Sequence, residues 1–149
     1  MDKSKINGLA QAILENESRQ LNNVAKQIGD DIVKASELII DNKGKLVICG
    51  LGKSGLIGQK IVATLCSTGT KSVFVHAAEA LHGDLGIYNP GDPTLLISKS
   101  GNTEELVRLI PILREFQSPL IALVGNMDSY MAKNVDIVLN GTIESEIDP

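Results

Sequence analysis

Hydrophobic residues recur at spacings of three and four along residues 3–42, which is the pattern of an amphipathic helix. They include Ile6, Leu9, Ile13 and Leu21. Gly29 interrupts the pattern, so the sequence fits either two helices or one bent helix. Because a lone domain does not easily cover so much apolar surface, we expect this segment to pack against a partner subunit in a homodimer or homotetramer.

From residue 45 onward, short continuous apolar runs alternate with helical patterns. The apolar runs predict strands over 45–50, 71–76, 93–98, 119–125 and 135–141. Helices are predicted over 53–69, 102–117 and 128–134, the last of them capped by Asp128. Residues 77–92 are predicted to be mostly loop with one helical turn, and 142–149 to be an irregular tail.

Strands that alternate with helices, each strand a continuous apolar run, predict an α/β fold with a doubly wound parallel sheet covered on both faces. Five strands favour the flavodoxin-like order 2-1-3-4-5, in which ligands bind at the carboxyl ends near strands one and three. We therefore expect one domain over 1–149, made of an N-terminal helical segment (1–44) and an α/β core (45–149).

The composition excludes several classes of function. At 149 residues and 43% hydrophobic, the chain can bury the core of one domain. Its net charge of −4 and pI of about 5.1 give no electrostatic footprint for nucleic acid or an anionic membrane. No apolar run approaches the roughly 20 residues of a membrane span, and the polar N-terminus does not resemble a signal peptide. Cys49 and Cys66 fit buried, inert thiols in a reducing cytoplasm.

A glycine-rich turn follows the first predicted strand. Gly50, Gly52 and Gly55 satisfy G-x-G-x-x-G, which alone is a weak signal for dinucleotide binding. A dinucleotide fold also needs an acid at the end of the second strand, but that strand ends at His76 and the nearest acid is Glu79, in the loop beyond. A nucleotide-binding oxidoreductase is therefore disfavoured.

Lys53 is the unusual residue of this turn. The segment "GKS" (52–54) is similar to the end of a P-loop, but Val47 stands where that motif requires its first glycine. A tight strand-to-helix turn explains the glycines, yet it does not explain a lysine beside a helix N-terminus, because the charge opposes the helix dipole. The placement predicts an anion, or a developing negative charge, near Lys53.

A second glycine turn, "SKSGNTEE" (98–105), follows the third predicted strand. Ser98, Ser100 and Thr103 supply three hydroxyls beside the free backbone N–H groups of a helix that starts at about Gly101–Thr103, an arrangement that suits phosphate. Helix capping by Ser100 or Asn102 is the alternative, but capping needs one hydroxyl and not three. We therefore favour a phosphate cradle.

Two adjacent carboxylates follow these hydroxyls, although negative charge repels a phosphate. Both favour the positive end of the helix dipole. We predict that Glu104 points to solvent and that Glu105 lies near the ligand, because a carboxylate beside a phosphate needs a chemical task.

The stretches "GLGKSGLIGQKIVATLCSTGT", "HAAEALHGDLG", "ISKSGNTEEL" and "ESEIDP" resemble the SIS (sugar isomerase) domain of the D-arabinose-5-phosphate isomerase family. The resemblance covers nearly all of the chain from residue 45, and "GKSG", "STGT" and "HGDLG" are its most specific parts. The S-x-S-G-x-T turn alone is shared by many phosphosugar-binding SIS domains, including transcriptional regulators. It does not by itself imply catalysis.

The resemblance implies an isomerase that interconverts D-arabinose 5-phosphate and D-ribulose 5-phosphate, requires no cofactor, and feeds the Kdo sugar of lipopolysaccharide or capsule. The matching catalytic positions are Lys53, Glu105, Glu146 and His82. We expect Glu146 or Glu105 to take the proton from C2, since a carboxylate can do this when burial tunes its pKa. Lys53 would stabilise the enediolate, and His82 would shuttle a proton between oxygens.

The resemblance also implies the substrate-binding positions. Gly69 and Thr70 match a substrate-contacting turn, and His76 matches a histidine implicated in inhibitory zinc binding. The full set is Gly52, Ser54, Gly69, Thr70, His76, His82, Ser98, Ser100, Gly101 and Thr103. A structural zinc site is not expected, because two histidines without paired cysteines fall short of the usual four ligands.

Three of these residues also have a purely structural interpretation. His76 can be a partly buried residue at a strand end, and His82 with Asp84 can pin the loop by hydrogen bonds. Glu146 lies with Glu144 and Asp148 in an acidic run that solvation alone would explain.

The chain departs from the family pattern in two respects. Family members continue beyond the position of Pro149 with a Pro-Thr-Ser-Ser-Thr segment, a helix and an "HPGG" motif, and many carry a CBS pair. We therefore expect this chain to lack the family's C-terminal part. If the natural protein ended here, a non-catalytic phosphosugar sensor would gain weight; because the sequence stops in an irregular tail, we favour a fragment of an enzyme. Lys99 stands where other members often have asparagine or alanine, and it can contact phosphate or face solvent.

Overall fold

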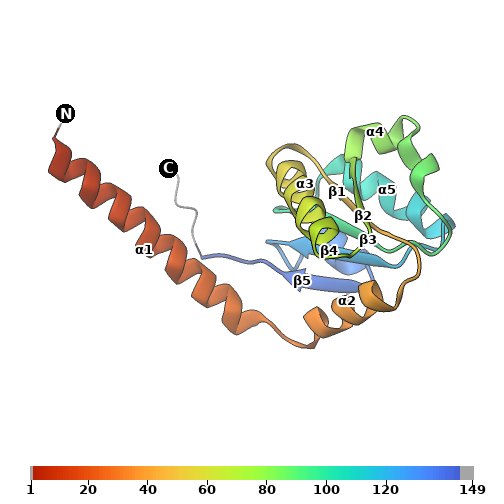
Figure 1. Cartoon of the computed structure of the whole chain (residues 1–149), viewed down its shortest axis with the longest axis horizontal. Helices are drawn as coiled ribbons and strands as arrows, with labels where there is room; N and C mark the ends of the chain where they lie inside the picture. Colours follow the sequence, from red (N-terminus) through yellow and green to blue (C-terminus); the bar gives the residue numbers. More distant parts are fainter. Residues whose placement is uncertain (1, 145–149) are drawn as a thin grey trace.

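Five parallel strands form one sheet in the order β2–β1–β3–β4–β5 (Figure 1), which confirms the order predicted from the sequence. The computed structural model describes residues 2–144. The strands are β1 (Leu46–Gly50), β2 (Ser72–His76), β3 (Thr94–Ser98), β4 (Leu120–Val124) and β5 (Ile137–Asn140), each inside its predicted range. Because β1 and β3 are neighbours, with Gly50 opposite Ile97, the two glycine turns leave the same edge of the sheet side by side.

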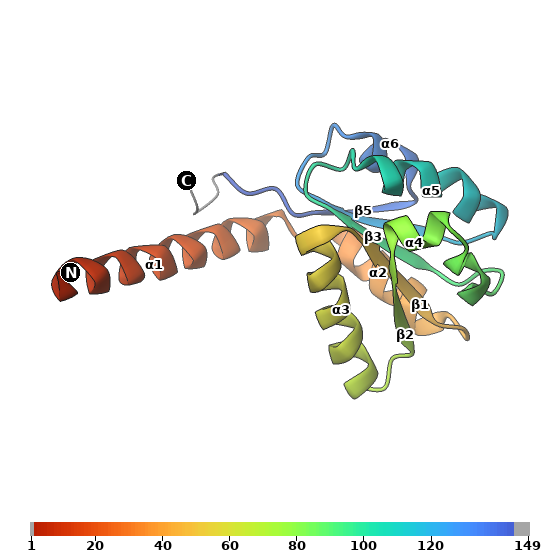
Figure 2. The same cartoon turned by 90° about the horizontal axis from the view of Figure 1, so that it is seen from above.

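Helices cover both faces of this sheet (Figure 2). On one face, α2 (Asp30–Asp41) and α3 (Gly52–Ser67) pack against side chains such as Ile48. On the other face, α4 (Ala77–Leu81), α5 (Glu104–Glu115) and α6 (Tyr130–Asn134) pack against side chains such as Val47. Successive strand residues point to opposite faces, so continuous apolar strands supply both layers of the core. The α/β fold class is confirmed.

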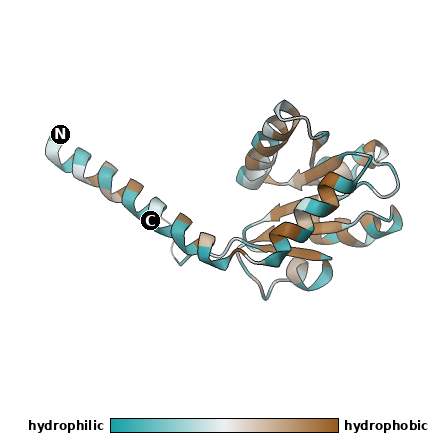
Figure 3. Ribbon diagram, turned by 60° about the horizontal axis from the view of Figure 1, so that its bottom comes forward, coloured by the Kyte–Doolittle hydropathy of each residue, from teal (hydrophilic) through white to brown (hydrophobic). Residues whose placement is uncertain are grey.

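The first helix, α1 (Lys3–Gln27), projects away from the α/β core (Figures 1 and 2). It ends before Gly29, so the N-terminal segment is two helices and not one bent helix. Within α1 the one buried residue is polar, Gln20. Apolar side chains along it stay exposed, among them Leu9 (62%) and Leu21 (71%). Figure 3 shows brown, hydrophobic positions alternating with teal ones along this helix. No helix in residues 2–144 is long and apolar enough to cross a membrane.

The structure corrects two local predictions. Residues 77–92 hold a helix, α4, and a 3₁₀ turn, η1 (Asp84–Ile87), which is more regular structure than one helical turn. The predicted cap of the sixth helix, Asp128, is wrong: α6 begins at Tyr130, and Ser129 Oγ accepts the backbone N–H of Ala132 at 3.3 Å. Aspartate and serine both cap helices well, so the sequence alone could not show which of the neighbours Asp128 and Ser129 is the cap.

The prediction of two buried thiols is correct for Cys49 and wrong for Cys66. Cys49 lies in β1, and burial raises the pKa of its thiol to about 12, as expected for an inert group. Cys66 is exposed on α3, where hydrogen bonding with the hydroxyl and then with the backbone of Ser72 lowers the pKa of the thiol. The apolar helix pattern did not reveal that this part of α3 stays uncovered.

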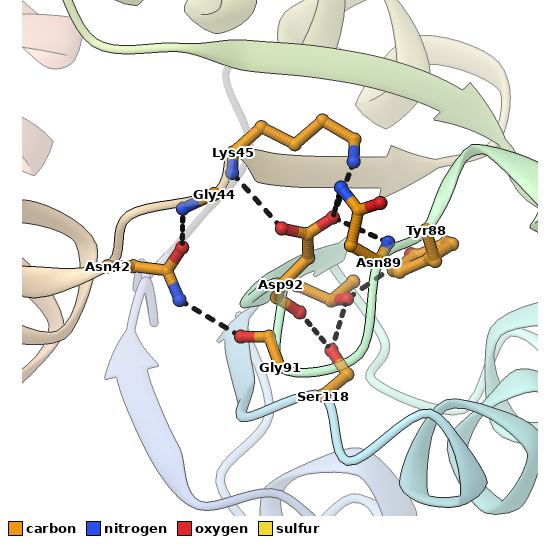
Figure 4. A network of polar contacts seen from close by, with 9 residues as sticks. Asn42, Gly44, Lys45, Tyr88, Asn89, Gly91, Asp92 and Ser118 are labelled. Atoms are coloured by element: carbon orange, nitrogen blue, oxygen red, sulfur yellow. Dashed lines mark hydrogen bonds and ion pairs between the residues drawn. The ribbon is translucent and has the colours of Figure 1, made fainter.

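A buried carboxylate ties the loop before β3 to the start of β1 (Figure 4). Asp92, which is 2% exposed, accepts hydrogen bonds from the ammonium of Lys45, from the backbone N–H of Lys45 (3.1 Å) and from that of Asn89 (2.8 Å). The Ser118 hydroxyl donates to the Asp92 carbonyl at 2.7 Å. Burial alone would raise the pKa of Asp92, but the bonds from Lys45 and Asn89 outweigh it and hold the pKa below its ordinary value.

We expect Asp92→Asn to lower the free energy of unfolding by about 2–4 kcal/mol, because it leaves the Lys45 ammonium without its buried anion. The matched control is Asp31→Asn, whose ion pair with Lys34 is exposed, so its loss should cost clearly less stability than the loss of Asp92. Since the folded pKa of Asp92 is depressed, its contribution is present above the unfolded value of about 4 and is lost as the pH falls further. Urea unfolding should therefore show that the difference in the free energy of unfolding between wild type and Asp92→Asn is smaller at about pH 3 than at about pH 7.

Candidate functional site

Three hydroxyls converge where β3 ends. Ser98 Oγ lies 2.8 Å from Thr103 Oγ1 and 3.5 Å from Ser100 Oγ, and it accepts the backbone N–H of Gly101 at 3.0 Å. Gly101 has a φ of 65°, and a Cβ at this position would overlap the side chain of Ser129. The turn that gathers the hydroxyls therefore requires glycine.

These hydroxyls do not cap the following helix. α5 begins at Glu104, after the predicted start, and the side chain of its N-cap residue, Thr103, accepts no hydrogen bond from the helix. Ser100 Oγ accepts the N–H of Asn102 at 3.2 Å, within the turn itself. Capping thus does not account for the three hydroxyls, and the positive end of the α5 dipole faces the turn.

The two carboxylates of α5 differ in their surroundings: Glu104 faces solvent as predicted, while the placing of Glu105 near the ligand stays a prediction. The Glu104 side chain is 83% exposed and its Oε1 lies 3.9 Å from Nη1 of Arg108, one turn along the helix. Glu105 is half-buried. The structure is therefore consistent with a solvent-facing Glu104 and a Glu105 closer to the core.

Two adjoining hollows open at this edge of the sheet. One, of about 490 Å³, lies at the hydroxyl turn, and the other, of about 430 Å³, lies against the residues that follow β5. Ser54, Ser98 and Lys99 line both of them. A ligand at this edge would thus touch both glycine turns.

The first glycine turn borders the same hollows. α3 begins at Gly52, whose φ is 54°, and a Cβ at Gly50 would lie 3.1 Å from backbone atoms of Ser54 and Gly55. Ser54 is half-buried and lines the hollows, whereas Lys53 is exposed in the first turn of α3. Among residues 2–144 no carboxylate forms an ion pair with Lys53, so the helix dipole is opposed by an uncompensated charge.

The two histidines lie in different environments. His76 ends β2 beside Gly50, is half-buried, and its Nδ1 is buried without a hydrogen-bond partner in the described chain. His82 is exposed at the end of α4, and neither it nor Asp84 forms a side-chain hydrogen bond within the described residues. No group of three or more His, Cys, Asp or Glu side chains in residues 2–144 is placed to hold a metal ion. The zinc role of His76 stays a prediction.

Gly69 and Thr70 do not join the other candidate residues. They precede β2, at the amino edge of the sheet, and line a separate hollow of about 330 Å³ together with Asn42 and Lys45. Within one copy of the chain, the other candidate residues lie at the carboxyl ends of the strands, which is the opposite end from Gly69 and Thr70. Their predicted contact with substrate therefore has no support from the geometry of a single chain.

Glu146, the other predicted catalytic acid, lies outside the described residues. The segment just before it reaches the site, because Gly141, Ile143 and Glu144 line one of the hollows. The sequence pattern predicted Gly141 as the end of a strand and 142–149 as an irregular tail, with no place for either in the site. A usable signal existed, since the carboxyl end of β5 must lie at the same sheet edge as the ends of β1 and β3.

The sheet order and the hydroxyl turn define a class of α/β domains whose ligand site lies at the carboxyl edge of the sheet. The chain belongs to the SIS domain family, whose model matches residues 38–147. It is 47% identical over 141 residues to the "Probable arabinose 5-phosphate isomerase" of Haemophilus influenzae, an alignment that covers 95% of this chain and 42% of that protein. It is 44% identical over 140 residues to arabinose 5-phosphate isomerase KdsD of Pseudomonas aeruginosa, covering 94% and 43%.

A solved structure shows how close the fold is. The protein c3406 of Escherichia coli CFT073, solved in complex with arabinose 5-phosphate, superposes with a TM-score of 0.94 at 34% identity, over 99% of this chain and 79% of that one. The chain spans less than half the length of the curated relatives named above.

Proposed function

We propose that this protein interconverts D-arabinose 5-phosphate and D-ribulose 5-phosphate as an aldose–ketose isomerase. The observation that carries the proposal is the convergence of Ser98, Ser100 and Thr103 at the start of α5, a helix that none of them caps. A phosphate accepts hydrogen bonds from hydroxyls and from the N–H groups of a helix start. The relatives named as arabinose 5-phosphate isomerases support this substrate class.

The phosphate of the sugar would lie at the hydroxyl turn. We propose that Lys99, which is exposed and lines both hollows, adds a cationic contact there. Ser54, from the first glycine turn, lines both hollows as well and would hydrogen-bond the sugar. Gly52, Gly101 and the half-buried His76 complete the proposed substrate contacts at this edge.

The proposed reaction moves a proton between C1 and C2 through an enediol and needs no cofactor. We propose Glu105 or Glu146 as the base that takes the C2 proton. Lys53, an exposed cation at the start of α3, would stabilise the negative charge that develops on the sugar oxygen. His82 would move a proton between O1 and O2.

The wider setting is also a proposal. The exposed apolar residues of α1 support a homo-oligomer in which this helix packs against another copy. The family resemblance supports a product that is used to make Kdo, a sugar of lipopolysaccharide or capsule. The free thiols Cys49 and Cys66 suit the reducing cytoplasm.

Proton–deuterium exchange at C2 tests the activity directly. The full chain is incubated with arabinose 5-phosphate in deuterated water, and NMR follows deuterium at C2 together with the appearance of ribulose 5-phosphate. We expect both. Saturable binding of arabinose 5-phosphate without any exchange would replace the isomerase by a phosphosugar sensor, and absence of binding would contradict both functions.

A further inference from the structure

We propose that Gln20 is a positioning residue: from α1 it holds the segment 141–144, which forms one wall of the site. The inference has a structural part, which stands alone, and a catalytic consequence, which rests on the proposed function. α1 is otherwise detached from the α/β core, so a specific link between the helix and the site needs an explanation (Figure 1).

The wall is fixed to the sheet on one side. The backbone N–H of Gly141 donates to the carbonyl of Val124 at 2.8 Å, and Thr142 Oγ1 donates to Asn140 Oδ1 of β5 at 2.6 Å and lies 3.2 Å from the carbonyl of Gly125. These bonds end at Thr142. The next two residues, Ile143 and Glu144, also line the hollow beside Ser98 and Lys99, but within residues 2–144 no hydrogen bond ties them to the sheet.

α1 supplies the missing support on the other side. Gln20 Oε1 accepts the backbone N–H of Glu144 at 3.1 Å, and Gln27 Nε2 donates to the carbonyl of Thr142 at 3.2 Å. The two glutamines are seven positions apart, or about two helical turns, so both face the segment from one side of α1.

The burial of Gln20 shows where α1 meets the rest of the chain. It is 6% exposed, while Leu14 and Leu21 nearby are 66% and 71% exposed. A helix that docked by hydrophobic packing would bury its leucines and expose its amides. Here the amide is buried and hydrogen-bonded to backbone, which is the condition under which a buried polar group is tolerated. The contact therefore specifies the position of 142–144 and is not general packing.

The position of this wall matters for the proposed chemistry, because Glu146 lies two residues beyond Glu144. Catalytic groups must be placed closely, and an error of about 1 Å can cost about a hundredfold in rate. Loss of the Gln20 hydrogen bond would loosen Ile143 and Glu144, which line the hollow, without touching the hydroxyl turn proposed to bind phosphate.

The test replaces Gln20 by leucine in the full chain, which keeps size and helix propensity but removes the acceptor. Gln11→Leu is the matched control, since Gln11 is exposed on the same helix and bonds only to Glu15 in the described chain. We expect hydrogen exchange at the Glu144 amide to become at least about fivefold faster in Gln20→Leu alone. We also expect kcat for arabinose 5-phosphate to fall about tenfold with KM within about twofold.

Restoring the acceptor distinguishes positioning from damage to the helix. Gln20→Glu keeps an oxygen at Oε1 and should recover most of the slow exchange of the Glu144 amide. Unchanged exchange in Gln20→Leu would overturn the proposal. Faster exchange with unchanged kcat would overturn the catalytic consequence and limit Gln20 to a structural role. If the wild type shows no turnover, the proposed isomerase fails, and the exchange data still decide whether Gln20 holds the wall.

Discussion

Replacement of Lys53 by alanine is expected to lower kcat for arabinose 5-phosphate by about two to three orders of magnitude, the usual cost of removing one group that stabilises a developing oxyanion. Lys53 lies in the first turn of α3, beside the half-buried Ser54 that lines the hollows. The cation has no carboxylate partner among residues 2–144. A lysine that opposes its own helix dipole, and that has no ion pair in the described part of the chain, is what we expect where a ligand brings negative charge.

Stability separates this catalytic role from a structural one. Because Lys53 opposes the dipole, Lys53→Ala should leave the melting temperature unchanged or raise it slightly, by the equivalent of about 0.3–1 kcal/mol. The control is Lys60→Ala, an exposed lysine two turns further along α3, which should change neither turnover nor stability. Near-normal turnover in Lys53→Ala would remove Lys53 from the mechanism, and an equal loss in Lys60→Ala would point to a general effect of charge.

The sheet could be predicted because each strand is a short, mainly apolar run, and the three central strands, β1, β3 and β4, are largely buried on both faces. That pattern is local, and it fixes the α/β class and the edge at which ligands bind. The hydroxyl turn was likewise readable, since its glycine and three hydroxyls lie within six residues, Ser98 to Thr103. The local sequence was therefore enough to predict that the three hydroxyls lie close together.

What the sequence did not show depends on contacts between distant segments. Asp92 and Lys45 are 47 positions apart, and the Glu144 amide finds Gln20 124 positions away. No spacing rule brings such pairs together. Thr70 illustrates a related limit: a motif match says nothing about the sheet edge on which a residue lies, and the structure puts it on the amino edge.

The two glutamates at the start of α5 give the second strong prediction. Glu105→Gln is expected to lower kcat by about two orders of magnitude or more, as for loss of a general base, and to slow C2–deuterium exchange in parallel. Glu104→Gln should keep kcat within about twofold, since its side chain is 83% exposed and borders Arg108 and not the site.

Glu104→Gln and Glu105→Gln are closely matched variants. Both acids lie in the first turn of the same helix, so each substitution removes one favourable charge from the dipole and should cost a similar amount, about 0.3–1 kcal/mol of stability. Any difference in turnover must then come from what the side chains reach, because Glu105 is half-buried and Glu104 is not. Equal losses of kcat in the two variants would indicate that both glutamates act only through the helix dipole. Near-normal exchange in Glu105→Gln, with loss in Glu146→Gln, would assign the base to Glu146 and leave Glu105 a binding residue.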